Sequence, residues 1–325
     1  EIDDGTMLVR DVIDLETTYA RINGGANEPI IGSYNNKDLK LNKIENNTND
    51  LLTGTKITND NQEVKSNLEN ENENVKENYK TARLNHNTIL CKYILSNFEK
   101  RQKNKHNFWD IMDKLNNFVD VSDPDISLPN SQHLFQSAEE ARKNNEPRWF
   151  QLVCLIHDIG KIQAFIDEES EFGLSIQKQW AIVGDTFILG CQIPDTIIFP
   201  EFNELNRECR LKDSYGIYFP CCGLNNTLIS WGHDEFLYRV LLENKHTLPE
   251  EALYIIRFHS LYLWHKENEY SHFENLKDKK MKPWLKKFNQ YDLYTKSDKP
   301  LDLEELKPYY TELFKEFFGS LEILI

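Results

Sequence analysis

Long hydrophobic runs are missing from this chain of 325 residues, and their absence argues against a protein that crosses a membrane as helices. The apolar run LVCLI at residues 152–156 is far shorter than the roughly 20 residues that span a bilayer. The acidic start EIDDGTMLVRDV lacks the basic and apolar regions of a secretory signal peptide. We therefore expect a cytoplasmic protein with no membrane partner.

Basic residues are outnumbered by acidic ones, 38 Lys and Arg against 53 Asp and Glu, which gives a net charge of -15. Such a chain repels the phosphates of nucleic acids and lipids, so we expect no nucleic-acid partner. The six cysteines form no CxxC pair, and they give no sign of a zinc site or a disulfide scaffold. No glycine-rich loop precedes Gly160 and Lys161, which excludes a phosphate-binding loop.

Aromatic residues are absent between Tyr34 and Tyr79, where the chain is rich in Asn and Glu. A segment of this composition buries too little apolar surface to offset the entropy lost on ordering it. The sequence therefore predicts three regions. They are an N-terminal arm or short helix at 1–34, a disordered insertion at 35–78, and a helical domain that carries the chemistry at 79–325.

Apolar residues recur at helical spacing from Tyr79 onward, as Leu90, Ile94 and Phe98 illustrate. The same spacing recurs in later segments of the chain. The predicted helices cover residues 84–98, 108–118, 130–141, 149–159, 234–242, 250–258 and 308–318.

Helix ends and strands are predicted from shorter signals. Asn130 or Ser131 is expected to cap one helix, and Gly160 to end the next one. Alternating strand patterns are scarce, and only TIIF at 196–199 and GIYF at 216–219 are candidates for a hairpin. The predicted fold class is all-α, a single helical domain with at most a short β-hairpin.

Four histidines and two aspartates stand in short motifs that are well separated along the chain. They are His133 in NSQHLFQSAE, His157 and Asp158 in LIHDIGKI, His233 in SWGHDE, His259 in RFHSLY and Asp292 in FNQYDLYTK. The sharpest element is the His157–Asp158 pair in its apolar segment, because a buried carboxylate is costly unless a metal or another charge compensates it. Four imidazoles and two carboxylates suit two first-row metal ions, with positions left open for substrate and oxygen.

Longer motifs carry a family resemblance that runs from about Asp113 to the C-terminus. They are SDPDISLPNSQHLFQSAE, HDIGK, QWAIVGDTFILGC, YFPCCGLNNTLISWGHDE, IRFHSLYLWH, PWLKKFNQYDLYTK and LKPYY. Together they resemble the myo-inositol oxygenase family of HD-domain enzymes. The resemblance implies an oxidoreductase that cleaves the ring of myo-inositol with O2, giving D-glucuronate and water in the first step of inositol catabolism. It also implies an HD-type domain that surrounds two iron ions in a mixed-valent Fe(II)/Fe(III) state. We expect the protein to be a monomer.

The resemblance implies roles for individual residues by motif matching. One iron would be held by His133, His157, Asp158 and Asp292, and the second by His233 and His259, with Asp158 bridging both. Lys161 and Asp158 would be the catalytic residues, because an ammonium favours deprotonation of a nearby hydroxyl. The polyol pocket would consist of Asp120, Val121, Ser122, Lys161, Gly184, Asp185, His259, Ser260 and Lys296. Such a pocket offers the donors and acceptors that a cyclohexane hexol requires.

Two departures from the family pattern accompany the resemblance. Val121 stands where the family commonly has an acidic residue. The family's N-terminal FRNY or FRDY segment, whose arginine reaches the substrate, has no counterpart, and nothing supports Arg10 or Arg21 in its place.

Two alternatives stay open at this stage. Lysines are mostly exposed, so Lys161 is equally compatible with a plain surface position. An HD-type phosphohydrolase, in which a metal-activated hydroxide attacks a phosphate ester, is the alternative activity. That class requires clustered basic residues for phosphate charge, whereas the pocket expected here is acidic.

Overall fold

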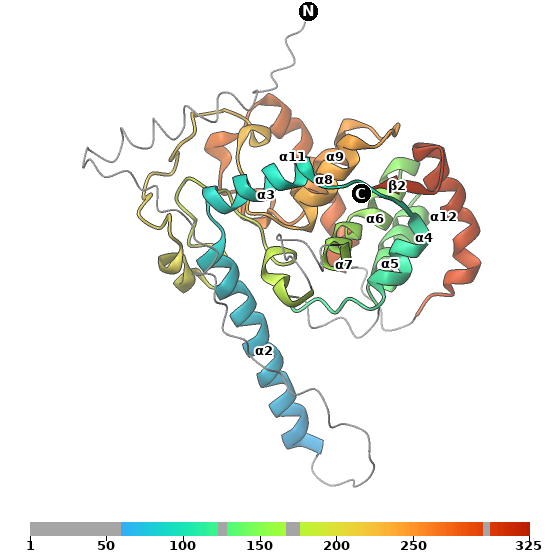
Figure 1. The fold of residues 1–325 in the computed structure, drawn as a ribbon, viewed down its shortest axis with the longest axis horizontal. Coiled ribbons are helices and arrows are strands. Elements are labelled where there is room, and N and C mark those ends of the chain that lie inside the picture. The colour runs from blue at the N-terminus through green and yellow to red at the C-terminus, as the bar shows by residue number, and fades with distance from the viewer. Residues whose placement is uncertain (1–59, 123–128, 167–175, 295–299) are drawn as a thin grey trace, which may run out of the picture. The chain divides into compact units, whose positions relative to one another are not determined.

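Helices make up almost all of the regular structure of this protein (Figure 1). The computed structural model describes residues 60–122, 129–166, 176–294 and 300–325. Glu69–Ile325 forms one compact unit. The predicted all-α fold is confirmed, whereas the arm at 1–34, the start of the insertion at 35–59 and Lys296 lie outside the described residues. None of the described helices is long and apolar enough to cross a membrane.

Eleven α-helices lie in the described part of the chain, and two pairs of them share a common partner. They are α2 (Asp60–Asn85), α3 (Thr88–Lys100), α4 (Phe108–Leu115), α5 (Asn130–Lys143), α6 (Arg148–Ile156), α7 (Gln163–Ile166), α8 (His233–Glu243), α9 (Glu250–Phe258), α10 (Tyr262–His265), α11 (Leu276–Tyr294) and α12 (Leu303–Phe318). Short 3-10 turns connect them: η1 (Ile159–Ile162), η2 (Ile176–Ala181), η3 (Pro200–Leu205), η4 (Leu224–Asn226) and η5 (Ser271–Phe273). Helix α5 packs along α6, and α8 packs along α9 (Figure 1). Helix α11 contacts α5, α6 and α9. The two pairs therefore meet at α11.

The described strands form one very small sheet between distant parts of the chain. Strand β1 (Lys105–Asn107) pairs antiparallel with β2 (Glu322–Leu324). The hairpin predicted from 196–199 and 216–219 is wrong, because neither segment forms a strand. Phe199 adopts a left-handed φ of 53° and leads directly into η3, which ends any extended conformation at that point.

Helix α6 is buried on every side, which distinguishes it from an amphipathic surface helix. Seven of its residues, from Phe150 to Ile156, are buried. A helix that is apolar all round belongs to the centre of a domain. The two residues that follow it, His157 and Asp158, are buried as well. Because they directly follow this central helix, His157 and Asp158 lie in the middle of the fold.

The start of α5 differs from the predicted cap. Pro129 occupies the N-cap position and makes no side-chain cap, so Asn130 and Ser131 are the first residues of the helix rather than caps. Their side chains bond instead to the end of the preceding segment, Asn130 Nδ2 to Phe118 O at 3.3 Å and Ser131 Oγ to Asn116. These bonds hold α5 against the segment that leads to Asp120.

Gly160 is not the helix end that the sequence predicted. Helix α6 already ends at Ile156, and Gly160 lies within η1. The glycine is required for a different reason, since a Cβ at this position would lie 2.0 Å from His233 O. The backbone of α8 thus approaches η1 more closely than any side chain permits.

Gly160→Ala is expected to push His233 out of position and to destabilise the fold by about 3 kcal/mol, the upper part of the usual range for overpacking. Thermal unfolding and metal analysis of the purified variant measure both effects. Gly319→Ala is the matched control, because its φ of 75° is strained but nothing lies within 4 Å of the new Cβ. Metal content should fall in Gly160→Ala and stay unchanged in Gly319→Ala. Equal metal content in the two variants would contradict the prediction.

Helix α2 changes the interpretation of the Asn/Glu-rich stretch. The sequence predicted disorder over 35–78, but the structure has residues 60–78 within α2. Glu and Lys are good helix formers, and a helix can extend into solvent when its other end is packed. Tyr79 and Arg83 provide that packing, since both are buried.

Candidate metal centre

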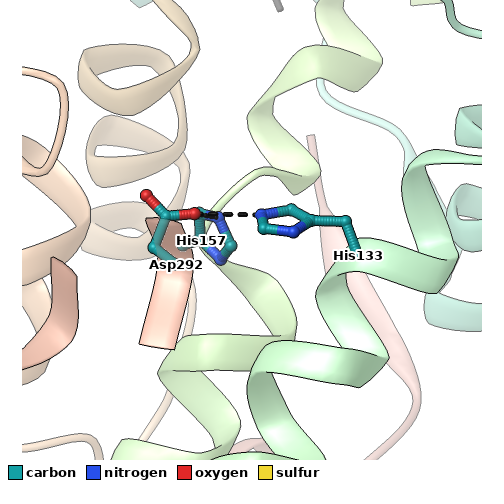
Figure 2. A group of neighbouring side chains, drawn as sticks. All are labelled: His133, His157 and Asp292. Atoms are coloured by element: carbon teal, nitrogen blue, oxygen red, sulfur yellow. Dashed lines mark hydrogen bonds and ion pairs between the residues drawn. The ribbon is translucent and has the colours of Figure 1, made fainter. Parts of the chain in front are cut away.

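A first group of side chains joins three helices. His133 comes from α5, His157 follows the end of α6, and Asp292 comes from α11. Asp292 Oδ1 lies 2.9 Å from His133 Nε2 and 3.2 Å from His157 Nε2. Figure 2 shows the three side chains converging on the carboxylate, all of them buried. Two imidazole nitrogens and a carboxylate oxygen at this spacing are a typical metal-ligand set.

A second group lies beside it and consists of Asp158, His233 and His259. His233 is the first residue of α8, and His259 follows α9. Asp158 Oδ1 is 3.0 Å from His233 Nε2 and 3.7 Å from His259 Nε2. The two Nε2 atoms are themselves only 3.0 Å apart.

Asp158 connects the two groups. Its Oδ1 faces His233 and His259, while its Oδ2 lies 3.7 Å from His157 Nε2 in the first group. A carboxylate with one oxygen toward each of two histidine groups has the arrangement of a bridging ligand. Asp158 thus lies between the two groups, where a shared ligand would lie.

The histidine tautomers test whether cations fit this centre. Nδ1 of His157, His233 and His259 faces a backbone oxygen in each case, that of Cys154 at 2.9 Å, Ile182 at 2.7 Å and Ile256 at 2.8 Å. Each Nδ1–H therefore donates outward, which leaves the Nε2 lone pair of a neutral ring pointing inward. In the neutral state, His233 and His259 oppose two lone pairs at 3.0 Å. A cation between these atoms removes that repulsion, so the donor set fits a metal.

The charges of the centre favour the ligand form of both carboxyl groups. Burial alone would raise the pKa of Asp158, but the Lys161 ammonium and His157 hold it well below its usual range. Burial is likewise outweighed at Asp292, where His157 and His133 keep the pKa well below its usual range. Both groups are therefore ionised at neutral pH.

Lys161 lies in η1 and is buried, so the surface alternative for this lysine is wrong. Its Nζ lies 2.7 Å from Asp158 Oδ2 and 2.7 Å from Asp120 Oδ2. Burial would lower its pKa, but the two carboxylates raise it, so the amine is an ammonium. This ammonium joins a metal-ligand carboxylate to a residue of the expected polyol pocket.

The expected pocket residues near Lys161 form a connected group. Asp120 accepts hydrogen bonds from Ser122 Oγ at 2.6 Å and from Ser122 N at 2.8 Å. Val121 N donates to Gln179 Oε1 at 2.9 Å, so its contribution is made by the backbone and an apolar side chain is tolerated. Burial opposes ionisation of Asp120, but Lys161 and Ser122 lower its pKa.

The remaining pocket residues adjoin the second metal group. Ser260 follows His259 directly, and its carbonyl oxygen accepts a hydrogen bond from Thr186 N at 3.0 Å. Thr186 in turn follows Gly184 and Asp185. Gly184 has a φ of 99°, a left-handed conformation that glycine adopts readily. The structure therefore brings together the two sequence motifs around Asp185 and Ser260.

Two tyrosines at this place were not expected from the sequence. Tyr79 donates to Asp185 Oδ1 at 3.3 Å. Burial raises the pKa of Tyr262 well above its usual value, and the nearby carboxylates of Asp292, Asp185 and Asp158 add to this effect. Tyr262 stands inside the motif IRFHSLYLWH, three residues after His259, and that spacing was the only available signal.

Comparisons with known proteins agree with the site. The family model described as myo-inositol oxygenase matches residues 72–324. The chain is 46% identical over 231 residues to an inositol oxygenase of Danio rerio, covering 66% of this chain and 80% of the relative. It is 40% identical over 284 residues to an inositol oxygenase of Dictyostelium discoideum, covering 84% and 93%. It is also 40% identical over 248 residues to inositol oxygenase 1 of Arabidopsis thaliana, covering 75% and 78%.

Proposed function

The chain belongs to the myo-inositol oxygenase family, and we propose that it converts myo-inositol and O2 to D-glucuronate and water at the paired metal centre. The enzyme is an oxidoreductase that acts on myo-inositol. Its relatives in animals, plants and Dictyostelium carry the name inositol oxygenase. The observation that carries the proposal is the pair of buried His/Asp groups connected by Asp158.

Iron is the metal that we assign to both groups. His133, His157 and Asp292 would hold the first ion, His233 and His259 the second, and Asp158 would bridge them. Imidazole and carboxylate ligands suit iron, and three or four protein ligands per ion leave positions for substrate and O2. When bound, a mixed-valent iron pair would supply Lewis acidity and activate O2, which accepts the electrons that the polyol loses.

The chain's own residues contribute binding and proton transfer. We assign to Lys161 the stabilisation of a substrate oxygen as it loses its proton, since its ammonium lies in a buried site where charge interactions are strong. Asp120 keeps this ammonium in place from the opposite side. Asp120, Ser122 and Asp185 would accept or donate hydrogen bonds to the ring hydroxyls of the polyol.

A phosphohydrolase at this centre is less well supported. That reaction requires a cluster of cations around a phosphate dianion, whereas here the one buried lysine of the described residues lies between the carboxylates of Asp120 and Asp158, which repel a phosphate. A phosphomonoester assay with the iron-loaded protein, run beside the inositol assay, separates the two activities. We also propose that the enzyme is a cytoplasmic monomer. Light scattering of the purified protein tests its oligomeric state.

Anaerobic reconstitution with iron, partial oxidation and EPR spectroscopy test the proposed function. A coupled mixed-valent signal that changes on addition of myo-inositol is the expected result, together with O2-dependent formation of glucuronate. One tightly bound zinc per chain and turnover that does not depend on iron would contradict the assignment.

His233→Ala is expected to lose the second metal ion and to retain the first, because His233 belongs to only one of the two groups. Metal analysis should give close to one iron per chain, with turnover abolished. His86→Ala is a suitable control, since this buried histidine bonds to Ala82 O and belongs to neither group. Retention of two ions per chain in His233→Ala would exclude His233 as a ligand.

A further inference from the structure

Tyr79 on α2 contacts the expected polyol pocket from outside the motifs that resemble the family. Its hydroxyl donates to Asp185 Oδ1 at 3.3 Å across 106 positions of sequence. Its ring lies against Gly184, because a Cβ built on that glycine would be 3.2 Å from Tyr79 Cε1. One side chain thus touches two adjacent pocket residues through its ring and its hydroxyl.

The last turns of α2 hold Tyr79 in this position. Arg83 lies one turn later on the same face of the helix and donates to Ile198 O at 3.2 Å. Its guanidinium covers the ring of Phe187 at 4.7 Å. Asn206 Nδ2 donates to Arg83 O at 2.7 Å and so caps the end of the helix. These three contacts hold the end of α2, and the contacts of the Tyr79 ring with Gly184 and Phe199 set the direction of its hydroxyl.

The Asp185 carboxylate accepts the hydrogen bond of Tyr79 through Oδ1, which leaves Oδ2 for another donor. Among the described residues, Tyr79 is the one hydrogen-bond donor to its side chain, and Oδ2 has no partner there. The carboxyl group is half-buried, so Oδ2 is not sealed by protein. Burial raises its pKa to about 6, while Tyr79, Arg83 and Lys266 favour the ionised form. The Asp185 carboxylate also acts on Tyr262, whose pKa it raises.

We propose that Tyr79 is a positioning residue that orients the Asp185 carboxylate toward one hydroxyl group of the polyol, so that helix α2 completes the substrate pocket. The inference rests on the proposed function, because it takes Asp185 as a substrate contact. A carboxylate whose Oδ1 accepts from a fixed donor has a fixed plane, and its Oδ2 then accepts from a ligand in a defined direction.

Tyr79→Phe tests this role, because it removes the hydroxyl and keeps the ring against Gly184. The KM for myo-inositol is expected to rise roughly tenfold, the usual effect of losing a hydrogen bond to a charged group, with kcat within about twofold. Anaerobic calorimetry should show the same weakening of inositol binding. Loss of the donor also raises the pKa of Asp185 above about 6, so the acid limb of kcat/KM should move to higher pH.

Tyr310→Phe is the matched control, because this buried hydroxyl also donates to a carboxylate, Glu139 Oε1 at 2.7 Å, outside the expected pocket. It should lower the melting temperature and leave KM unchanged. Wild-type KM and binding in Tyr79→Phe, or an equal rise of KM in both variants, would overturn the inference alone. A wild-type protein that neither binds nor cleaves myo-inositol would overturn the proposed function and this inference with it.

Discussion

Asp158→Ala is expected to lose both metal ions and all measurable turnover. Asp158 has an oxygen toward each histidine group, so its removal takes away the bridge and the negative charge that compensates two cations. It also leaves the Lys161 ammonium with Asp120 as its one remaining partner among the described carboxylates. The neutral isostere Asp158→Asn should behave in the same way, because shape is kept and charge is lost.

Iron content per chain and O2-dependent glucuronate formation measure this prediction. Asp278→Ala provides the control, because Asp278 is an equally buried carboxylate that bonds to Leu224 N and Asn275 N outside the centre. It should lower stability and leave iron content intact. If Asp158→Ala retained two ions per chain, the bridging assignment would be wrong.

Lys161→Ala is expected to keep both metals and to reduce turnover by roughly a hundredfold, since loss of one transition-state charge contact in a dry site costs about 3 kcal/mol. Lys161→Arg should not restore activity, because the planar guanidinium cannot fit as a point charge between Asp120 and Asp158. Steady-state kinetics on the iron-loaded variants measure the effect.

The ion pairs of Lys161 add a second expectation that separates stability from catalysis. In Lys161→Ala the buried Asp120 carboxylate loses its counter-charge, so the melting temperature should fall as well. Adding Asp120→Asn should restore stability without restoring turnover. Lys282→Ala, which breaks an ion pair with Glu274, serves as the control. Turnover near the wild-type level in Lys161→Ala would remove Lys161 from the mechanism.

The two groups of candidate ligands could be predicted from the sequence because each of their residues stands in a local motif. His157 and Asp158 are neighbours in a buried helix end, and that pattern alone indicates a compensating cation. The motif also included Lys161, although only the structure gives its two carboxylate partners. Candidate ligands that stand in short local motifs can therefore be predicted from the sequence without a structure.

Contacts between distant segments were not predictable in the same way. Nothing in the sequence around Gly160 reveals that His233 O lies where its Cβ would be. Tyr79 meets Asp185 across 106 positions, and β1 pairs with β2 although the two strands lie far apart in the sequence. Each of these contacts depends on how whole helices pack, which hydrophobic periodicity does not specify. For the same reason, the polar composition before Tyr79 predicted disorder, whereas residues 60–78 belong to helix α2.

The candidate ligands come from α5, α8 and α11 and from the ends of α6 and α9, so the centre connects five of the described α-helices. Binding at such a point stabilises the whole fold, because any cation bound by the native state alone adds its binding free energy to the free energy of unfolding. The apoprotein, in contrast, lacks this contribution and should open more often to proteases. With the proposed iron pair, the lifetime of the enzyme in a cell should therefore follow the supply of iron, so that the capacity to degrade inositol depends on metal nutrition without a separate regulator.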